Sequence, residues 1–304
     1  PTARYESFNS LDQVKLFTKE DEPVVVKASG LASGKGVVLC RNGKEARSAI
    51  QSIMQGKVFG NAGDQVVIEE FLTGQEVSLL AFTDGKTILP LESAQDHKAA
   101  FDDDKGPNTG GMGAYSPAPI FTDELKKKVI DEIMIPTVRA MAKEGRYYRG
   151  ILYAGLMLTE SGPKVLEFNA RFGDPETQPI MMRIKNDIVP IFEACIDGTL
   201  ATQTLQWKPE STVCVVMAAK GYPGSYEKGN EITGLNLDEN QQAMVFHAGT
   251  KLDNGKVLTN GGRVLGVTAL GLNINQAIKN AYSVVDKIKW DGIHFRKDIG
   301  SKAN

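Results

Sequence analysis

The sequence predicts an α+β protein in which small antiparallel sheets and amphipathic helices are followed by a mixed α/β unit at the carboxyl end. Segments of alternating apolar residues interchange along the chain with segments in which apolar residues recur about every 3.6 positions. Hairpin signals such as Asp84-Gly85 separate neighbouring strand patterns, which favours antiparallel pairing. The length of 304 residues suggests about two domains.

Composition and charge argue against several classes of protein. Hydrophobic residues make up 41% and charged residues 24% of the chain, as in ordinary globular proteins. The formal net charge of −2 gives no basic excess, so we expect no nucleic-acid partner. No apolar run approaches the roughly 20 residues that a spanning helix needs, so we also expect no membrane association.

The first residues and the cysteines bear on the origin of the chain. The sequence begins with Pro1 and shows no apolar core of a signal peptide, so we expect a processed chain or a piece of a longer polypeptide. Cys40, Cys195 and Cys214 are scattered among apolar neighbours and match no disulfide or zinc pattern. We therefore expect buried thiols and a cytoplasmic location.

The amino-terminal third predicts one helix among several strands. The helix is expected over residues 44–55, because Ile50, Ile53 and Met54 fall on one face. The strands are expected over residues 23–27, 37–40, 65–72, 77–82 and 87–91.

The middle of the chain begins with a glycine-rich segment, residues 105–119. Four glycines fall in the eight positions from Gly106 to Gly113, where we expect neither a helix nor a packed strand. A helix should begin at Thr122 or Asp123 and be kinked or split at Pro136. Asp187 should cap another helix, which ends at Gly198. Strands are expected over residues 151–158 and 164–168.

Residues 199–210 resemble a linker to a last unit of mixed structure. A strand is expected over residues 213–218 and an amphipathic helix over residues 276–288. Asn260-Gly261 is a strong turn signal, so we expect residues 256–259 and 263–269 to pair as a hairpin.

The first candidate site places Lys27 at the end of a strand and Lys35 inside the glycine- and serine-rich loop that follows. Glycines allow backbone N–H groups to approach phosphate oxygens, and two ammonium groups offset phosphate charge. The spacing is not that of a P-loop, because Gly36 stands where Ser or Thr should follow the lysine and another strand follows. A hairpin loop with solvated lysines is the alternative.

The second candidate site is the strand end from Glu69 to Leu72 and the turn after it. Backbone groups beyond the end of a strand can hydrogen-bond the edge of an adenine, and Glu76 can accept hydrogen bonds from ribose hydroxyls. The alternative is an edge strand with surface glutamates.

The third candidate site is the segment from Glu167 to Arg171. Glu167 and Asn169 share one face of a strand, because side chains two positions apart point the same way. Their oxygen atoms suit a hard cation such as Mg²⁺, which keeps waters and nucleotide phosphates as further ligands. Arg171 can stabilise a transferring phosphoryl group. Polar residues at a solvated strand end are the alternative.

The fourth candidate site joins the segment around His97 to the glycine-rich segment. Four glycines between Gly106 and Gly113 favour either a flexible anion-binding loop or a plain surface loop. We interpret His97 as solvated or structural. No nucleophile elbow and no Cys/His metal cluster occurs, so the chemistry should come from ATP, a hard metal and the placement of charge.

These segments together resemble the glycinamide ribonucleotide synthetase (phosphoribosylamine–glycine ligase) family of the ATP-grasp superfamily. The resemblance covers nearly the whole chain and rests on the motifs KASGLASGKGV, IEEFLTGQEVS, AQDHK, GPNTGGMGAYSP, LEFNARFGDPE and KGYPGSYEKG, in the order of the family. It implies two α+β lobes that grip ATP, over residues 1–73 and 74–198. A linker and a carboxyl-terminal mixed α/β domain would cover residues 199–304.

The resemblance also implies roles for single residues. The residues that would bind the nucleotide are Lys27, Lys35, Glu69, Glu70, Phe71, Leu72 and Glu76. Arg171 and Lys35 would act in catalysis, and Glu167 and Asn169 would hold Mg²⁺ or Mn²⁺. The residues that would shape the acceptor site are Asp96, Lys98, Asn108, Gly110 and Gly111.

The implied activity is the ATP-dependent ligation of glycine to 5-phosphoribosylamine through a glycyl phosphate, in de novo purine biosynthesis. Two departures from the family pattern qualify it. The doubly wound amino-terminal domain with which the family usually begins has no counterpart here, so other domains of a longer or multifunctional polypeptide are expected. The acidic residue that many relatives carry on the strand before the metal-binding glutamate is Gly155 in this chain. The alternatives are another ATP-grasp carboxylate–amine ligase and a truncated ATP-binding module.

Overall fold

The computed structural model describes residues 1–17, 21–30, 32, 36–236 and 242–303. The chain forms two compact units. The first comprises Pro1–Gln75 and Met157–Leu166, and the second comprises Glu76–Leu156 and Glu167–Asn304. Within the described residues, no helix is both long and apolar enough to cross a membrane.

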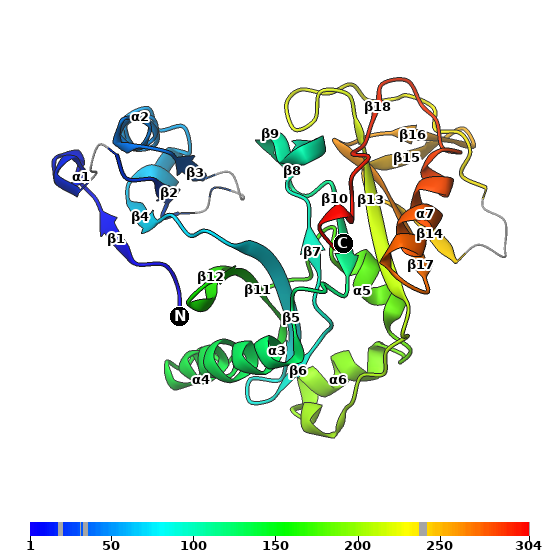
Figure 1. The fold of residues 1–304 in the computed structure, drawn as a ribbon, viewed down its shortest axis with the longest axis horizontal. Coiled ribbons are helices and arrows are strands. Elements are labelled where there is room, and N and C mark those ends of the chain that lie inside the picture. The colour runs from blue at the N-terminus through cyan, green and yellow to red at the C-terminus, as the bar shows by residue number, and fades with distance from the viewer. Residues whose placement is uncertain (18–20, 31, 33–35, 237–241, 304) are drawn as a thin grey trace. The chain divides into compact units, whose positions relative to one another are not determined.

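The first unit is built on an antiparallel sheet with the strand order β1-β4-β2-β3 (Figure 1). The strands are β1 Tyr5–Phe8, β2 Val24–Ala28, β3 Val37–Cys40 and β4 Val66–Glu70. The helices are α1 Leu11–Phe17 and α2 Gly43–Met54, with a short 3-10 turn at Gly60–Gly63. The predicted strands and the predicted helix of this region are confirmed, with ends shifted by one or two residues.

Helix α2 covers the sheet of the first unit because its apolar residues lie on one face. Ile50 and Ile53 are buried against Val26 and Ile68 of the strands. The helix begins after Asn42, whose side-chain oxygen accepts a hydrogen bond of 3.0 Å from the backbone N–H of Glu45. The core of this unit therefore follows from the periodicity of helix and strands.

The second unit contains a main sheet of order β14-β17-β13-β10-β7, with β18 beside β13 (Figure 1). A further sheet has the order β12-β11-β5-β6, and of its residues Gln75 and those between 157 and 166 are assigned to the first unit. Strands β8-β9 and β15-β16 form two ribbons. The strands up to β12 are β5 Gln75–Thr83, β6 Ile88–Pro90, β7 Gln95–Asp96, β8 Ala99–Phe101, β9 Lys105–Asn108, β10 Gly113–Ser116, β11 Gly150–Thr159 and β12 Gly162–Asn169. The later strands are β13 Ser211–Ala219, β14 Ala243–His247, β15 Thr250–Asp253, β16 Lys256–Thr259, β17 Arg263–Gly271 and β18 Ile293–His294.

The helices of the second unit pack on these sheets. The α-helices are α3 Asp123–Val129, α4 Ile135–Lys143, α5 Thr177–Arg183, α6 Val189–Asp197 and α7 Ile274–Val285, and short 3-10 turns occupy Asp102–Asp104, Leu200–Thr202 and Ser301–Ala303. Helix α7 lies against β13 and β17. The predicted break at Pro136 takes the form of a π-helical turn, Ile130–Met134, between α3 and α4.

Strand β13 is the centre of the main sheet, and all but its first residue are buried. It pairs with β17 on one side and with β10 on the other. The prediction that residues 106–113 hold no packed strand is therefore wrong at Gly113, with which β10 begins. Gly113–Ser116 is fully buried as β10. Its first residue must be a glycine, because a Cβ at Gly113 would lie 2.6 Å from the carbonyl oxygen of Cys214 on β13.

The predicted hairpin around Asn260-Gly261 is also wrong. Strand β16 pairs with β15, and β17 pairs with β13 and β14. The turn that joins β15 to β16 is Asn254-Gly255, in which Asn254 adopts a positive φ of 48°. All but the first residue of β17 are buried, which favours its place in the main sheet over a hairpin with β16. The three cysteines are buried free thiols, as predicted.

Two smaller predictions need correction in the segment before β13. The residue that caps α6 is Ile188, and Asp187 accepts a hydrogen bond from the N–H of Val189 from one position earlier. Gly198 ends the helix in a left-handed conformation, as predicted. Leu200, in the segment that we predicted to be a linker, is completely buried in the core with residues of β5 and β11.

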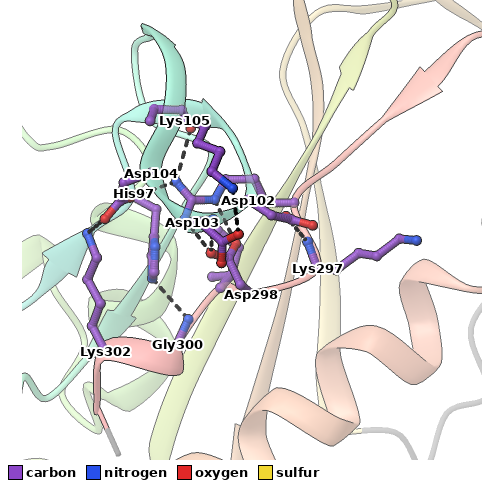
Figure 2. Close-up of polar contacts among 12 residues, drawn as sticks. His97, Asp102, Asp103, Asp104, Lys105, Lys297, Asp298, Gly300 and Lys302 are labelled. Carbon is purple, nitrogen blue, oxygen red and sulfur yellow. Dashed lines mark hydrogen bonds and ion pairs between the residues drawn. The ribbon is translucent and has the colours of Figure 1, made fainter.

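The end of the chain is fastened to the turn between β8 and β9. Figure 2 shows Asp298, Gly300 and Lys302 facing the turn Asp102–Asp104 and His97. The guanidinium of Arg296, only 1% exposed, donates to both oxygens of Asp298 and, over 2.9 Å, to Asp104. Burial alone would raise the pKa of Asp298, but the hydrogen bonds from Arg296 and from the N–H of Asp103 lower it to about 2.

We expect replacement of Arg296 by Met to lower the free energy of unfolding by about 3 kcal/mol, because the carboxylates of Asp104 and Asp298 lose their partner. The depressed pKa of Asp298 stabilises the wild type above pH 4 and this contribution disappears as the pH falls towards 2, so the deficit of the variant should shrink over that range. Urea unfolding at pH 7 and pH 3 measures both effects. Arg139→Met, at an exposed position of α4, is the control. Equal deficits at both pH values would contradict the role of Asp298.

Candidate functional site

The first unit contributes Lys27, which lies near the end of β2. Its ammonium group is 2.8 Å from a carboxylate oxygen of Glu69 and donates over 3.0 Å to the carbonyl of Leu166. The side chain is about one fifth exposed and so carries a charge that is held in place yet reachable from solvent. Lys35, predicted to bind phosphate, lies outside the described residues.

The end of β4 in the first unit is anchored by Glu70. Its carboxylate forms ion pairs of 2.7 Å with both Lys164 and Arg4. The hydrogen bonds from Lys164 and then from Arg4 lower the pKa of Glu70 to about 2. The last ladder pair of β4 joins Glu70 to Val24, so Phe71 and Leu72 continue beyond the ladder, as an adenine-binding backbone requires.

The second unit brings together the three residues predicted at the end of β12. The amide nitrogen of Asn169 donates to the carboxylate of Glu167 over 3.1 Å, and Arg171 donates to the amide oxygen of Asn169 over 3.3 Å. Arg171 also donates to the carbonyl of Phe172 over 2.8 Å, which holds its guanidinium beside the strand. Gly155 lies next to Glu167, since a Cβ there would be 3.4 Å from the Cγ of Glu167.

The side-chain oxygen atoms at the end of β12 suit a hard cation that takes few of its ligands from the protein. Within the part of the chain that the structure describes, no group of three or more His, Cys, Asp or Glu side chains is placed to hold a metal. Glu167 and Asn169 supply two oxygen donors, and Glu167 is exposed. Such a pair suits Mg²⁺ or Mn²⁺, which takes its remaining ligands from water and phosphate.

A group of ionisable side chains in the second unit surrounds Asp96 on β7. Lys98 forms an ion pair with Glu76. Burial raises the pKa of Asp96 to about 7; Lys98 opposes this rise, and the negative charges of Glu176 and Glu76 add to it. Burial would lower the pKa of Lys98, but Asp96 and Glu76 outweigh burial and raise it. Asp96 therefore changes charge near neutral pH while Lys98 stays cationic.

Sequence reasoning did not assign a role to Glu176. This residue is 3% exposed, and its carboxylate accepts hydrogen bonds from Tyr153 at 2.7 Å and from Ser78 at 3.0 Å. Tyr153 lies on β11 and Ser78 on β5, so three distant segments meet at one carboxylate. The only signal in the sequence was the position of Glu176 at the end of the motif that contains Glu167.

The glycine-rich residues 108–112, here called the acceptor loop, are held by hydrogen bonds within the protein. The N–H of Thr109 donates to the carbonyl of Lys98, the N–H of Gly110 to the hydroxyl of Tyr222, and the N–H of Gly111 to the hydroxyl of Thr109. Of the two predicted alternatives, a flexible anion-binding loop and a plain surface loop, neither anticipated that the amide groups of these three residues donate to partners within the protein. The side chain of Asn108 is exposed.

His97 lies between Asp96 and Lys98 in the sequence. Of the two predicted roles, solvated or structural, the structure supports the structural one. The ring of His97 is completely buried, and Nε2 accepts a hydrogen bond of 3.0 Å from the N–H of Gly300. Burial lowers the pKa of His97 to about 4, with the charges of Lys302 and Arg296 adding to the effect. The ring is therefore neutral at neutral pH. His97 also links the end of the chain to the acceptor loop, because its backbone carbonyl accepts a hydrogen bond from the N–H of Met112.

Comparison with known families decides the affiliation of the chain. Residues 1–177 match the family described as phosphoribosylglycinamide synthetase, ATP-grasp (A) domain, and residues 212–302 match the C domain of the same enzyme. The chain belongs to the phosphoribosylglycinamide synthetase family. The resemblance inferred from the motifs is thereby confirmed, and with it the assignment to ATP-grasp ligases.

Several relatives of the chain share one name, phosphoribosylamine–glycine ligase. The phosphoribosylamine–glycine ligase of Rhodopirellula baltica is 53% identical over 100% of this chain and 71% of the relative. That of Pseudomonas aeruginosa is 50% identical, with the same coverage. The crystal structure of the Thermotoga maritima phosphoribosylamine–glycine ligase superposes with a TM-score of 0.89 at 36% identity, covering 98% of this chain and 74% of that one.

More distant structures share only the fold. The biotin carboxylase domain of the Hydrogenobacter thermophilus 2-oxoglutarate carboxylase, solved with MgADP, superposes with a TM-score of 0.73 at 15% identity, covering 97% of this chain and 64% of that one. The predicted α+β architecture of ATP-grasp type is confirmed. The predicted domain boundaries at residues 73 and 198 stay predictions.

We expect Asp96→Asn to stabilise the protein more at pH 8 than at pH 5. A carboxyl group whose pKa is raised in the folded state holds its proton there, so stability falls as the pH rises from about 4 through about 7. Asparagine does not titrate, so the variant keeps its stability as the pH rises. We expect the increase in the free energy of unfolding at pH 8 to exceed that at pH 5 by about 1–2 kcal/mol. Urea unfolding at the two pH values measures it, with Asp197→Asn, an exposed carboxylate of α6, as control. A gain that is independent of pH would show that Asp96 is ionised throughout.

Proposed function

We propose that this chain joins glycine to 5-phosphoribosylamine at the expense of ATP, giving glycinamide ribonucleotide, ADP and phosphate in de novo purine biosynthesis. The observation that carries the chemistry is the row formed by Glu167, Asn169 and Arg171, in which two oxygen donors for a cation lie beside a guanidinium. The substrates are those in the name of relatives that are 50–53% identical over the whole chain.

In the first step a carboxylate oxygen of glycine attacks the γ-phosphorus of ATP. The bond from that phosphorus to the β,γ-bridging oxygen breaks, ADP leaves with the electron pair, and glycyl phosphate forms. Lys27 and Lys35 offset phosphate charge, and Arg171 stabilises the charge that spreads over the oxygens of the transferring group. Positioning and charge placement suffice, because the substrate carboxylate is itself the nucleophile.

In the second step the amine nitrogen of phosphoribosylamine attacks the carbonyl carbon of glycyl phosphate. The bond from this carbon to the phosphate oxygen breaks, inorganic phosphate leaves, and the nitrogen loses one proton. Asp96, whose pKa lies near 7, and the cationic Lys98 flank the acceptor loop and are the charged groups that we assign to this half of the site, together with Asn108, Gly110 and Gly111.

Different residues bind the nucleotide and the metal ion. The backbone of Glu69, Glu70, Phe71 and Leu72 binds adenine, and Glu76 binds the ribose. Glu167 and Asn169 hold Mg²⁺ or Mn²⁺, which when bound neutralises phosphate charge and orients the γ-phosphoryl group. Glu176 supports this part of the site by accepting hydrogen bonds from Tyr153 and Ser78. The free thiols of the chain support a cytoplasmic location.

A coupled assay of ADP release by the full-length polypeptide tests the substrates. We expect ADP release to require glycine, and sustained turnover to require phosphoribosylamine as well, because without the amine glycyl phosphate forms but is not consumed. Alanine in place of glycine, and ammonia in place of phosphoribosylamine, are the matched controls. Comparable rates with another pair would favour a different ATP-grasp ligase. MgATP binding without turnover by any pair would favour an ATP-binding module.

We expect Glu167→Gln to weaken binding of MgATP at least about 10-fold, because a charged metal ligand becomes neutral at constant shape. Calorimetric titration with ATP over a series of Mg²⁺ concentrations measures the change. The loss should shrink when the nucleotide is added without Mg²⁺. Glu160→Gln, at an exposed turn, is the control. Unchanged MgATP affinity in the Glu167 variant would remove this residue from the metal site.

A further inference from the structure

Arg263, at the beginning of β17, joins two segments that the proposed function uses separately. Its Nη1 donates to the carbonyl of Gly110 over 2.7 Å and to that of Asp174 over 2.9 Å. Its Nη2 forms an ion pair of 2.8 Å with the carboxylate of Asp174. The side chain is 21% exposed, so most of it is packed within the protein.

The two segments are the acceptor loop and the turn that follows the metal-binding strand. Asp174 lies shortly after Arg171 along the chain, in the turn that leads from β12 to α5. The loop also touches this turn directly, since a Cβ at Gly111 would lie 2.3 Å from the Cδ of Pro175. The guanidinium of Arg263 thus holds together two segments that are already in close contact at Gly111 and Pro175.

The geometry needs an arginine. One planar group meets carbonyls on both segments and a carboxylate on one of them, which a lysine ammonium on a flexible stem does not reproduce. The hydroxyl of Tyr222 accepts from the N–H of Gly110, so both backbone groups of this glycine are held by residues from the carboxyl-terminal part of the chain. The position of the loop therefore depends on β17 and on the segment that contains Tyr222.

We propose that Arg263 is a positioning residue that fixes the acceptor loop against the turn after β12, so that the amine meets the acyl phosphate before water does. This inference rests on the proposed function. A displacement of about 1 Å between reacting groups can cost about 100-fold in rate, whereas the metal-binding strand end keeps its own hydrogen bonds without Arg263. Loss of Arg263 therefore separates the two steps: glycyl phosphate still forms, but transfer of its glycyl group to the amine, with release of phosphate, becomes slow.

Three measurements on Arg263→Ala in the full-length polypeptide test the separation. Hydroxylamine traps glycyl phosphate, because its nitrogen attacks the carbonyl carbon and displaces phosphate, which gives a hydroxamate. We expect hydroxamate formation and MgATP affinity to stay within about 2-fold of the wild type. We expect ligation to phosphoribosylamine to fall about 10- to 100-fold. The ratio of ADP released to glycinamide ribonucleotide formed should then rise well above that of the wild type.

Further variants distinguish a specific effect on the acceptor loop from a general loss of structure. Gly110→Ala places a Cβ 3.0 Å from the Cζ and Nη2 of Arg263 and should raise the same ratio without removing the charge. Arg263→Lys should recover part of the ligation rate. Asp174→Asn keeps the carbonyl contacts and should have a smaller effect than Arg263→Ala. Arg139→Ala, exposed on α4, is the control that should leave all readouts unchanged.

Two results would overturn the inference. One is an unchanged ratio of ADP to product in Arg263→Ala, or in Gly110→Ala if the first variant does not fold. The other is a parallel fall of hydroxamate formation and ligation, which would mark a purely structural residue. Failure of the proposed function looks different, because the wild type itself would then form no glycine-dependent hydroxamate.

Discussion

The antiparallel ladder in which β13 pairs with β10 on one side and with β17 on the other is the constraint on which the rest of the second unit depends. It joins a short strand from the middle of the chain to long strands near its end. Because β10 begins directly after the acceptor loop and β17 begins with Arg263, the ladder register delivers the guanidinium to the loop. The burial of β13 along nearly its whole length makes this register costly to change.

A second consequence of the ladder is electrostatic. Strand β7 lies beside β10, which places Asp96 at a partly buried position near Lys98 and Glu76. Burying a carboxyl group next to other carboxylates raises its pKa, and a neighbouring ammonium limits the rise. Groups that change charge near neutral pH suit proton transfer, and such groups gather at functional sites. The fold therefore sets the protonation of the acceptor region as well as its shape.

The candidate site could be predicted from the sequence wherever one short segment supplied the geometry. Glu167, Asn169 and Arg171 come together because a strand repeats every two residues, and Lys27 lies at a strand end that its own apolar pattern defines. The same local reasoning failed for residues 256–269, where the turn at Asn260-Gly261 suggested a hairpin. Burial decided in favour of pairing β17 with β13 and β14. Local turn preference is worth less than the apolar area that the central strand buries.

The sequence by itself determined the family, most helices and strands of the amino-terminal third, and the row of polar residues at the end of β12, because motif spacing and periodicity are local properties. Only the tertiary structure revealed that Glu176 binds Tyr153 and Ser78, and that Arg263 bonds to both Gly110 and Asp174. It also showed that the amide groups of Thr109, Gly110 and Gly111 in the acceptor loop donate to partners inside the protein. These contacts join segments far apart in the sequence. They depend on which strands pair across the sheet, and that choice is made by burial summed over the whole unit.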